Sequence, residues 1–339
     1  MRRTLSAIGL GLICLVAAAC GGNDSSPPAQ SGGSGDGAPS AAGLRVAYAS
    51  ALDPNDIADQ FGLQAAKAKV QTLNDDSAVV AGLLRRSIDI GNVDYDAAMK
   101  AKATGVPIKV IYISQTKPEY VFVARPEISS LDQLSGKNVG YHAPGSQTEI
   151  FARNLVKEKV PGIYDKVKFV ALEESSRRAQ AMEAKRLDAS SLEAINLAQL
   201  RKQGGYHELG TWADLSGSAE KVLGTAWITT EAYYTRNKPR LDAFVKAMQG
   251  GYDRFYADKQ AWVDLARTKL PDVDQSLLPG VYDVYSKAQM YPKAGTPAVT
   301  PAVFKANDAF FRDLGEWEDP IADDVIAYDL VNAGSKAAK

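Results

Sequence analysis

From residue 44 onward, short apolar runs alternate with segments of helical periodicity. A strand pattern at 44–48 is followed by a helix at 57–68, which Asp53-Pro54 marks as a start signal. Further strands are predicted at 70–73, 88–92, 108–113 and 120–124, and further helices at 75–84 and 97–103. Strands that alternate with helices predict a mostly parallel sheet built from βαβ units.

The alternation restarts further along the chain, with strands at 138–141, 168–172 and 187–190 and helices at 147–159, 177–184 and 192–202. Segments 79–92 and 179–191 share one design: a helix with an apolar face, two basic residues, then Ile-Asp or Leu-Asp before small residues. We interpret this as two α/β lobes of related topology, with one large sheet as the alternative. After a strand at 225–229 the chain is mainly helical, with helices predicted at 239–256, 260–270, 276–287 and 301–314.

Residues 1–19 have the pattern of an export signal: two arginines and then an apolar run of 15 residues, shorter than the ~20 that span a bilayer. Cys20 follows at the expected cut site, as in a bacterial lipobox, where the thiol is acylated. Residues 21–43 are almost wholly small or polar, which is typical of a flexible tether of ~25 Å. We expect a domain anchored by lipid at Cys20 on the extracytoplasmic face. An ordinary signal peptide that contains a cysteine is the alternative.

Cysteine usage and charge narrow the function classes. The chain has two cysteines, Cys14 and Cys20, so the exported domain would hold no disulfide and no thiolate site. A net charge of −1 gives no reason to invoke nucleic acid. His142 lies near Ser146, but nothing orients the pair as a nucleophile and base, and the common hydrolase, metalloprotease and P-loop motifs are absent from the sequence. We therefore expect neither an enzyme nor a cofactor or metal site.

Several motifs, in their order and spacing, make the chain resemble extracytoplasmic solute-binding proteins of ABC importers, in the nitrate, sulfonate, taurine and thiamine-precursor group. The motifs are 83–92, Gly105-Val106-Pro107, 131–140, 144–148 and 187–189, within a resemblance that covers nearly all of 44–332. The resemblance implies a two-lobed, type II periplasmic-binding-protein fold with two hinge crossings and a helical C-terminal part. We place the crossings near Arg125-Pro126 and at 214–218, which makes 44–125 plus 218–332 the first lobe and 126–217 the second.

The resemblance also implies partners and a role. A monomer would capture a small organic solute between its lobes and deliver it to a membrane permease driven by a cytoplasmic ATPase. A lipoprotein that senses a solute is the alternative. The chain departs from the family at Arg86 and Lys185, where glycine is usual. It also departs at 94–96 and at Glu193, where relatives often have small or aromatic residues.

Ligands of open parallel sheets bind beyond the carboxyl ends of strands, which points to the loops that follow the predicted strands. In the best candidate, Ser146 begins a helix whose free amides, with the Ser146 and Thr148 hydroxyls, would bind a carboxylate or sulfonate. The alternative is a capping box of Ser146 and Glu149, which satisfies those amides itself. Asp94 is either a helix cap or a group that faces the cleft.

Glu193 is likewise either a solvated helix residue or a cleft residue. In the cleft these two carboxylates would favour an amino group, so we predict a taurine-like zwitterion, with a thiamine-pyrimidine-like heterocycle as the alternative. The aromatic residues would form apolar walls. The predicted ligand-binding residues are Tyr48, Asp94, Tyr95, Gln115, His142, Ser146, Gln147, Thr148, Ser191, Glu193 and Trp227.

Overall fold

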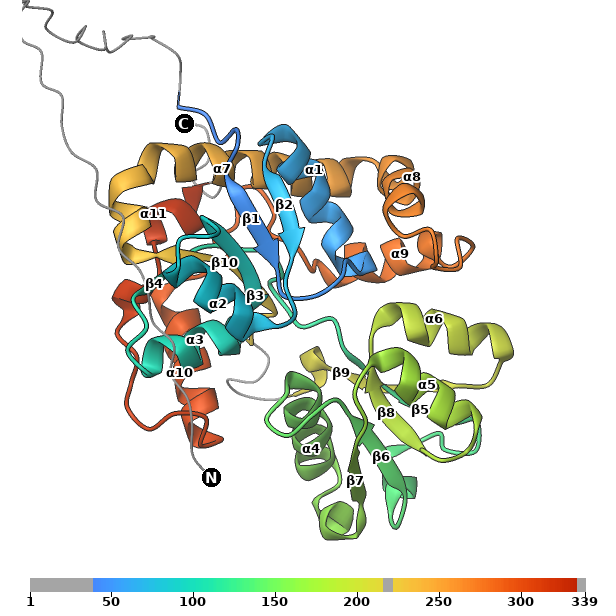
Figure 1. The fold of residues 1–339 in the computed structure, drawn as a ribbon. Coiled ribbons are helices and arrows are strands. Elements are labelled where there is room, and N and C mark those ends of the chain that lie inside the picture. The colour runs from blue at the N-terminus through green and yellow to red at the C-terminus, as the bar shows by residue number, and fades with distance from the viewer. Residues whose placement is uncertain (1–38, 216–221, 334–339) are drawn as a thin grey trace, which may run out of the picture. The chain divides into compact units, whose positions relative to one another are not determined.

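The computed structural model describes residues 39–215 and 222–333. Within these ranges the chain forms two lobes, each built on a five-stranded sheet with helices packed against it (Figure 1). The two-lobed α/β fold is thereby confirmed, and the alternative of one large sheet is wrong. The predicted signal segment, Cys20 and most of the predicted tether lie outside the described residues.

The sheet of the first lobe has the strand order β2-β1-β3-β10-β4. Its strands are β1 (Arg45–Tyr48), β2 (Lys69–Thr72), β3 (Ile90–Asp94), β4 (Ile108–Ile113) and β10 (Thr225–Thr230). Its helices are α1 (Ile57–Ala65), α2 (Asp76–Leu84), α3 (Tyr95–Ala103), α7 (Glu231–Ala257), α8 (Lys259–Lys269), α9 (Leu278–Ala288), α10 (Pro301–Asp313) and α11 (Tyr328–Val331), with short 3-10 turns at Pro54–Asp56 and Asp323–Val325.

The sheet of the second lobe has the order β7-β6-β8-β5-β9. Its strands are β5 (Val121–Ala124), β6 (Asn138–Tyr141), β7 (Lys168–Ala171), β8 (Ala189–Leu192) and β9 (His207–Thr211). Its helices are α4 (Gln147–Lys159), α5 (Ser175–Glu183) and α6 (Ala194–Gln203), with 3-10 turns at Leu131–Leu134, Pro161–Lys166 and Trp212–Asp214. Strand β9 was not predicted.

Strands that enter a lobe from the other lobe run against their neighbours. β10 pairs antiparallel with β3 and β4, and β5 pairs antiparallel with β8 and β9. Thr225 lies opposite Asp94, and Val121 lies opposite Leu192, so both entering strands begin at the edge where the parallel strands end. Each sheet is therefore mixed, with four strands in one direction and one against them, because the arriving strand starts at the carboxyl edge and runs back.

The first crossing between the lobes lies within residues 114–120, because β4 belongs to the first sheet and β5 to the second. The sequence placed this crossing at Arg125-Pro126. In the structure these residues follow the end of β5, and the Arg125 guanidinium pairs with Asp188 of the second lobe at 2.9 Å. Pro126 therefore marks the end of a strand rather than a change of lobe. The second crossing lies between Thr211 and Thr225, and the predicted position at 214–218 falls partly outside the described residues.

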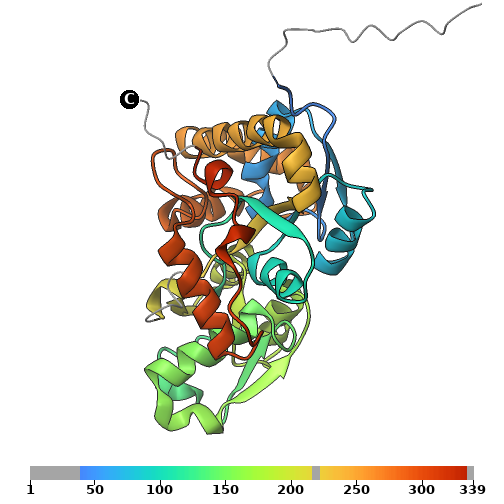
Figure 2. The same cartoon turned by 90° about the vertical axis from the view of Figure 1, so that its left-hand side faces the viewer.

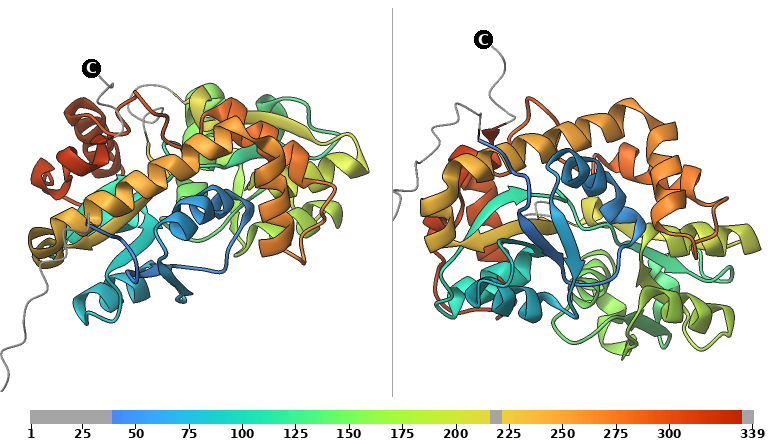
Figure 3. Two further views of the ribbon diagram at one scale, coloured as in Figure 1. Left: turned by 90° about the horizontal axis from the view of Figure 1, so that it is seen from above. Right: turned by 45° about the horizontal axis from the view of Figure 1, so that its top comes forward.

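Helix α7 lies beside α1, as Figure 3 shows, and the two approach closely at a glycine. A Cβ atom on Gly62 would come within 2.6 Å of the Met248 Cα, so no larger residue fits there. The backbone of α7 is non-helical at Asn237, two residues before Pro239, which cannot donate the helical hydrogen bond. The sequence predicted the part of α7 after this kink, and the structure adds the part before it.

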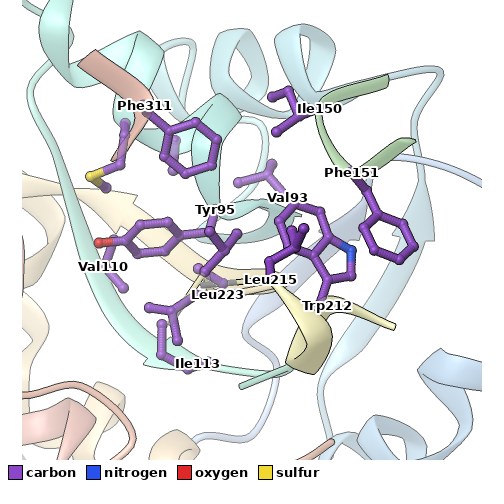
Figure 4. Close-up of a cluster of buried hydrophobic side chains, with 14 of the residues drawn as sticks. Val93, Tyr95, Val110, Ile113, Ile150, Phe151, Trp212, Leu215, Leu223 and Phe311 are labelled. Atoms are coloured by element: carbon purple, nitrogen blue, oxygen red, sulfur yellow. The ribbon is translucent and has the colours of Figure 1, made fainter. Parts of the chain in front are cut away.

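A cluster of buried apolar side chains includes residues of both lobes (Figure 4). Tyr95 and Ile113 come from the first lobe, and Phe151 of α4 stacks on Trp212 with ring centroids 5.2 Å apart.

Helix α10 extends along the first lobe toward the second (Figure 2). Among the described residues, no helix combines the length and apolarity needed to cross a bilayer.

Candidate ligand-binding site

The carboxyl edges of the two sheets surround a cavity of about 340 Å³. The first lobe contributes Tyr48 at the end of β1, Asp94 at the end of β3, and the loops that begin α1 and α2. The second lobe contributes His142 after β6 and Glu193 after β8. Glu119, from the first crossing, lines the same space. The cavity thus lies where ligands of such sheets bind.

Carboxyl groups dominate the wall of this cavity. Seven of them line it: Asp53, Asp56, Asp75, Asp76, Asp94, Glu119 and Glu193. No lysine or arginine is among the lining residues in the described part of the chain. The pKa of the His142 imidazole is lowered by its partial burial and by the nearby Arg178, which favours the neutral ring at neutral pH. The wall is therefore acidic, and within the described residues it has no lysine or arginine to balance those carboxyls that ionise.

Asp94 occupies the position that precedes α3, but its side chain makes no capping hydrogen bond. Burial raises its pKa well above the usual range, and the neighbouring carboxyls of Asp76 and Asp96 raise it further. Asp75 caps α2 instead, accepting the Ala78 amide at 2.7 Å. Asp76 accepts the Asp94 amide at 3.3 Å, and burial raises the pKa of Asp76 to about 7. Asp94 therefore faces the cavity rather than a helix end.

Glu193 resembles Asp94 in position and environment. It precedes α6 without a side-chain cap, and only its backbone amide is bonded there, to the Ser175 hydroxyl at 3.0 Å. Burial and then the charge of Asp53 raise the pKa of Glu193 to about 7, against the opposing effect of Arg178. The alternative interpretation of Glu193, a solvated helix carboxylate, does not fit a side chain that is partly buried and makes no capping hydrogen bond.

Glu119 is fixed by two donors of the first lobe. The Asn55 amide nitrogen donates to one carboxyl oxygen at 2.7 Å, and the Tyr285 hydroxyl donates to the other at 2.8 Å. The side-chain oxygen of Asn55 is buried and has no hydrogen-bond partner among the described residues. Because Asn55 lines the cavity, its oxygen is an acceptor available to a bound donor.

The Ser146, Thr148 and Glu149 side chains bond backbone amides at and just before the start of α4. The Ser146 hydroxyl accepts the Glu149 amide at 3.3 Å, and the Gly145 amide donates to the Glu149 carboxylate at 2.7 Å. The Thr148 hydroxyl accepts the His142 amide at 2.8 Å. This is the capping arrangement that the sequence analysis gave as the alternative to an anion site.

Three other predicted residues lie around the cavity without lining it. Gln147 donates to the Asp96 carboxyl at 2.8 Å and so links α4 to α3 across the lobes. The Ser191 hydroxyl donates to the Thr148 carbonyl at 3.1 Å inside the second lobe. Gln115, in the first crossing, is buried, and its backbone N–H donates to the Thr225 carbonyl at 3.3 Å.

The predicted aromatic residues divide between wall and core. Tyr48 lines the cavity, and its hydroxyl donates to Asp59 at 3.1 Å. Trp227 is fully buried behind it, with ring centroids 5.5 Å apart in an edge-to-face arrangement. Tyr95 points into the apolar cluster of Figure 4, close to Phe311. Of the predicted set, the structure brings together Tyr48, Asp94, His142 and Glu193 at the cavity, and places Tyr95, Gln115, Ser146, Gln147, Thr148, Ser191 and Trp227 outside its lining.

Most of the acidic wall was not predicted from the sequence. Asp53 and Asp76 lie in segments that were predicted only as helix starts, and both also line the cavity. Arg178 was not predicted either; it is 1% exposed and donates to the Ser191 and Leu172 carbonyls at 3.1 and 3.0 Å. Among the described residues, no group of three or more His, Cys, Asp or Glu side chains is arranged to hold a metal ion.

Comparison with known proteins identifies the family of this fold. Residues 64–261 match the model of the family described as NMT1/THI5 like. The periplasmic aliphatic sulphonate binding protein of Escherichia coli matches with a TM-score of 0.65 and 15% identity, over 82% of this chain and 89% of that one. The alkanesulfonate-binding protein of Xanthomonas axonopodis pv. citri matches with a TM-score of 0.63 and 17% identity, over 84% and 98% of the two chains. No curated protein matches the sequence significantly.

Proposed function

Because the chain belongs to the NMT1/THI5-like family, we propose that it is the solute-binding component of an ABC importer, and that its solute carries a positively charged nitrogen. The observation that carries this proposal is the cavity between the lobes, with seven carboxyls and no lysine or arginine in its described lining. Capture there would draw the lobes together around the solute. A monomer would then hand the solute to a permease driven by an ATPase.

The charge of the wall argues for a cation or a donor-rich solute. A buried carboxylate without a compensating charge costs several kcal/mol, which is why burial raises the pKa values of Asp94 and Glu193. An ammonium or amidinium group supplies both the charge and the N–H donors that the carboxyls and the Asn55 oxygen lack. A sulfonate or nitrate alone would meet the same wall with repulsion.

A protonated amino-heterocycle is the solute that this wall suits best. Its ring N–H and amino group would donate to carboxyls such as Asp94 and Glu193, and its flat face would lie on Tyr48 or Tyr120, which also line the cavity. The second candidate predicted from the sequence was a related ring, an uncharged thiamine-pyrimidine-like heterocycle, and the acidic wall favours its protonated form. We place it ahead of the taurine-like zwitterion, because the Ser146 and Thr148 hydroxyls that would have held the sulfonate lie outside the cavity lining and accept nearby backbone amides.

The taurine-like zwitterion is the second candidate, and Arg178 is the observation that favours it. This buried guanidinium influences the pKa values of three cavity residues, Tyr120, His142 and Glu193, so it lies close behind the wall of the second lobe. A zwitterion would direct its amino end to the carboxyls of the first lobe and its sulfonate toward Arg178. Such a solute needs Arg178, whereas a purely cationic solute does not.

Lipid attachment at Cys20 and an extracytoplasmic location are also part of the proposal, and both rest on the sequence of residues 1–43. Sensing of the solute without import would use the same cavity. A permease and an ATPase encoded beside this gene would favour import, and a neighbouring sensor kinase would favour signalling.

A thermal-shift experiment with matched ligands tests the charge of the solute. Ethylamine, taurine and ethanesulfonate share a two-carbon skeleton and differ only in their charged ends, and an aminopyrimidine adds the flat ring. A ligand at one hundred times its dissociation constant stabilises the fold by ~2.7 kcal/mol. We expect the amine and the aminopyrimidine to raise the melting temperature and ethanesulfonate to leave it unchanged. If ethanesulfonate raises the melting temperature while ethylamine and the aminopyrimidine do not, the proposal of a cationic solute is refuted.

A further inference from the structure

A second cavity, of about 260 Å³, lies at the opposite edge of the first sheet. Arg45 at the start of β1, Asp89 before β3 and Thr230 at the end of β10 line it, whereas Tyr48, Asp94 and Thr225 mark the edge at the solute cavity. The two cavities are thus separated by the length of the strands. We call this second cavity the arginine pocket.

The chemistry of the arginine pocket is the reverse of that in the solute cavity. Arg45, Arg86 and Arg236 line it, and its only carboxyl among the described residues is Asp89. Arg45 binds Asp89 through both a 2.6 Å ion pair and its backbone amide at 2.9 Å. That pairing leaves the Arg86 and Arg236 guanidiniums as the pocket's uncompensated charges, since neither has an ion-pair partner within residues 39–215 and 222–333.

The rest of the pocket wall is apolar and partly open to solvent. Leu83, Ile88 and Pro107 line it, together with Leu84, which is 48% exposed although it is a large hydrophobic residue. An anionic head group attached to an apolar chain would complement this combination of positive charge and apolar surface. A free inorganic anion would use the arginines but not the leucines.

Backbone strain at Arg86 is consistent with a role for its side chain. Its φ of 58° lies in the left-handed region, where glycine costs least and where the family usually has glycine. Lys185 has a φ of 57° at the matching place in the second lobe, so the strain alone does not identify the pocket. Lys185 therefore provides a control with the same backbone geometry but outside the arginine pocket.

The start of the folded chain lies at this same edge. Residues 39–44 lead directly into β1 (Figure 1), and Arg240 donates to the Ser40 and Ala42 carbonyls at 3.3 and 2.9 Å. Arg240 is also close enough to influence the pKa of Asp89. In the sequence, residues 21–38 lie between Cys20 and this edge, so the proposed lipid anchor would be joined to the folded lobe at this edge.

We propose that the arginine pocket binds the phosphate head group of an anionic membrane lipid, and that this edge of the first lobe rests on the bilayer surface. Arg86 and Arg236 contact the phosphate, and Leu84 contacts the upper part of the acyl chains. The direction in which the edge faces rests on the proposed anchor at Cys20. The lipid site itself does not, because it belongs to the folded lobe and operates without acylation.

Vesicle co-sedimentation tests this proposal with the chain 21–339, which keeps every described residue but lacks the signal and Cys20. We expect binding to vesicles that contain 30% phosphatidylglycerol, weaker binding as salt rises, and no binding to phosphatidylcholine alone. Arg86→Asn and Arg236→Gln should each weaken binding about fivefold, and Lys185→Asn should leave it unchanged. Asparagine tolerates the left-handed backbone, so the fold is preserved at both positions.

Three results would overturn the lipid site. One is equal binding to phosphatidylglycerol and phosphatidylcholine. Another is equal loss from Lys185→Asn and Arg86→Asn, which would show that only net charge matters. The third is a thermal shift with 10 mM inorganic phosphate that depends on Arg86, without vesicle binding, which would assign the pocket to a free anion. None of these results depends on solute binding, so the importer proposal stands or falls separately in the ligand screen.

Discussion

Raising the pH from 5 to 8 should destabilise the unliganded protein. Asp76 and Glu193 have pKa values of about 7 in the folded state, because burial disfavours their charged forms. In the unfolded chain such groups titrate near ~4. Between these values the folded state binds more protons than the unfolded state, so the free energy of unfolding falls as pH rises. This loss of stability is complete only when the pH exceeds the pKa values that Asp76 and Glu193 have in the folded state.

The size of this effect follows from the shifts. A difference of roughly three pKa units corresponds to about 4 kcal/mol for one isolated group. The acidic groups of the cavity interact with one another and are partly solvated, so their effects do not add. We therefore expect a total loss of ~2–4 kcal/mol, or a melting temperature ~5 °C lower at pH 8 than at pH 5. The lowered pKa of the partly buried His142 acts in the opposite direction, but His142 is a single group against several carboxyls.

Urea unfolding at several pH values, at constant ionic strength, measures this quantity directly. Asp76→Asn should flatten the pH dependence and raise stability at pH 8, because it removes one of the groups that must ionise. Asp132→Asn, on an exposed turn of the second lobe, serves as the matched control and should change neither. A stability that is flat or rises between pH 5 and 8 would refute our account of the acidic cavity. A bound cation should also flatten the curve, because it stabilises the ionised carboxyls.

Three further predictions concern single residues. Asp94→Asn and Glu193→Gln should each weaken the binding of an amine found in the screen about tenfold by calorimetry, since each removes a charge-assisted hydrogen bond; unchanged affinity in both would contradict the site. Ser146→Ala should cost ~1 kcal/mol in urea unfolding, because it removes the cap of α4, while leaving the affinity for that amine unchanged; a selective loss of affinity would restore the anion site at this helix. Cys20→Ala should release the protein from membranes or leave an unprocessed precursor on a gel, and fractionation like the wild type would argue against acylation.

The fold was largely accessible from the sequence because strand and helix periods are local signals. The repeated design of 79–92 and 179–191 even revealed two related lobes, and in both copies the helix is followed by a residue with positive φ, Arg86 and Lys185. The first crossing was misplaced because Pro126 ends a strand as readily as it would begin a linker. β9 was missed because its residues, from His207 to Thr211, are too polar to form an apolar run.

The site was harder to predict because the sequence around a residue does not determine which way its side chain points. Asp94 could have been a helix cap and Glu193 a solvated helix residue. Only the assembled cavity shows that both carboxyls make no cap and face the cavity. Ser146 had two interpretations with equal local support, and the geometry of Glu149 favours the cap. Asp76 and Glu119 approach the cavity from segments far apart in the sequence, so no spacing rule could have grouped them.

The position of β10 has a consequence for how the protein is made. All the strands of the second sheet lie in one continuous stretch, from Val121 to Thr211, so that lobe can form as soon as the stretch has left the ribosome. The first lobe cannot, because β10 lies between β3 and β4 and must be synthesised after the whole inserted lobe. Until Thr225–Thr230 arrives, β3 and β4 each lack a neighbour on the side that it will occupy. The interval between these events is when the chain exposes unpaired strand edges, and an export pathway that keeps it unfolded until synthesis is complete would avoid that exposure.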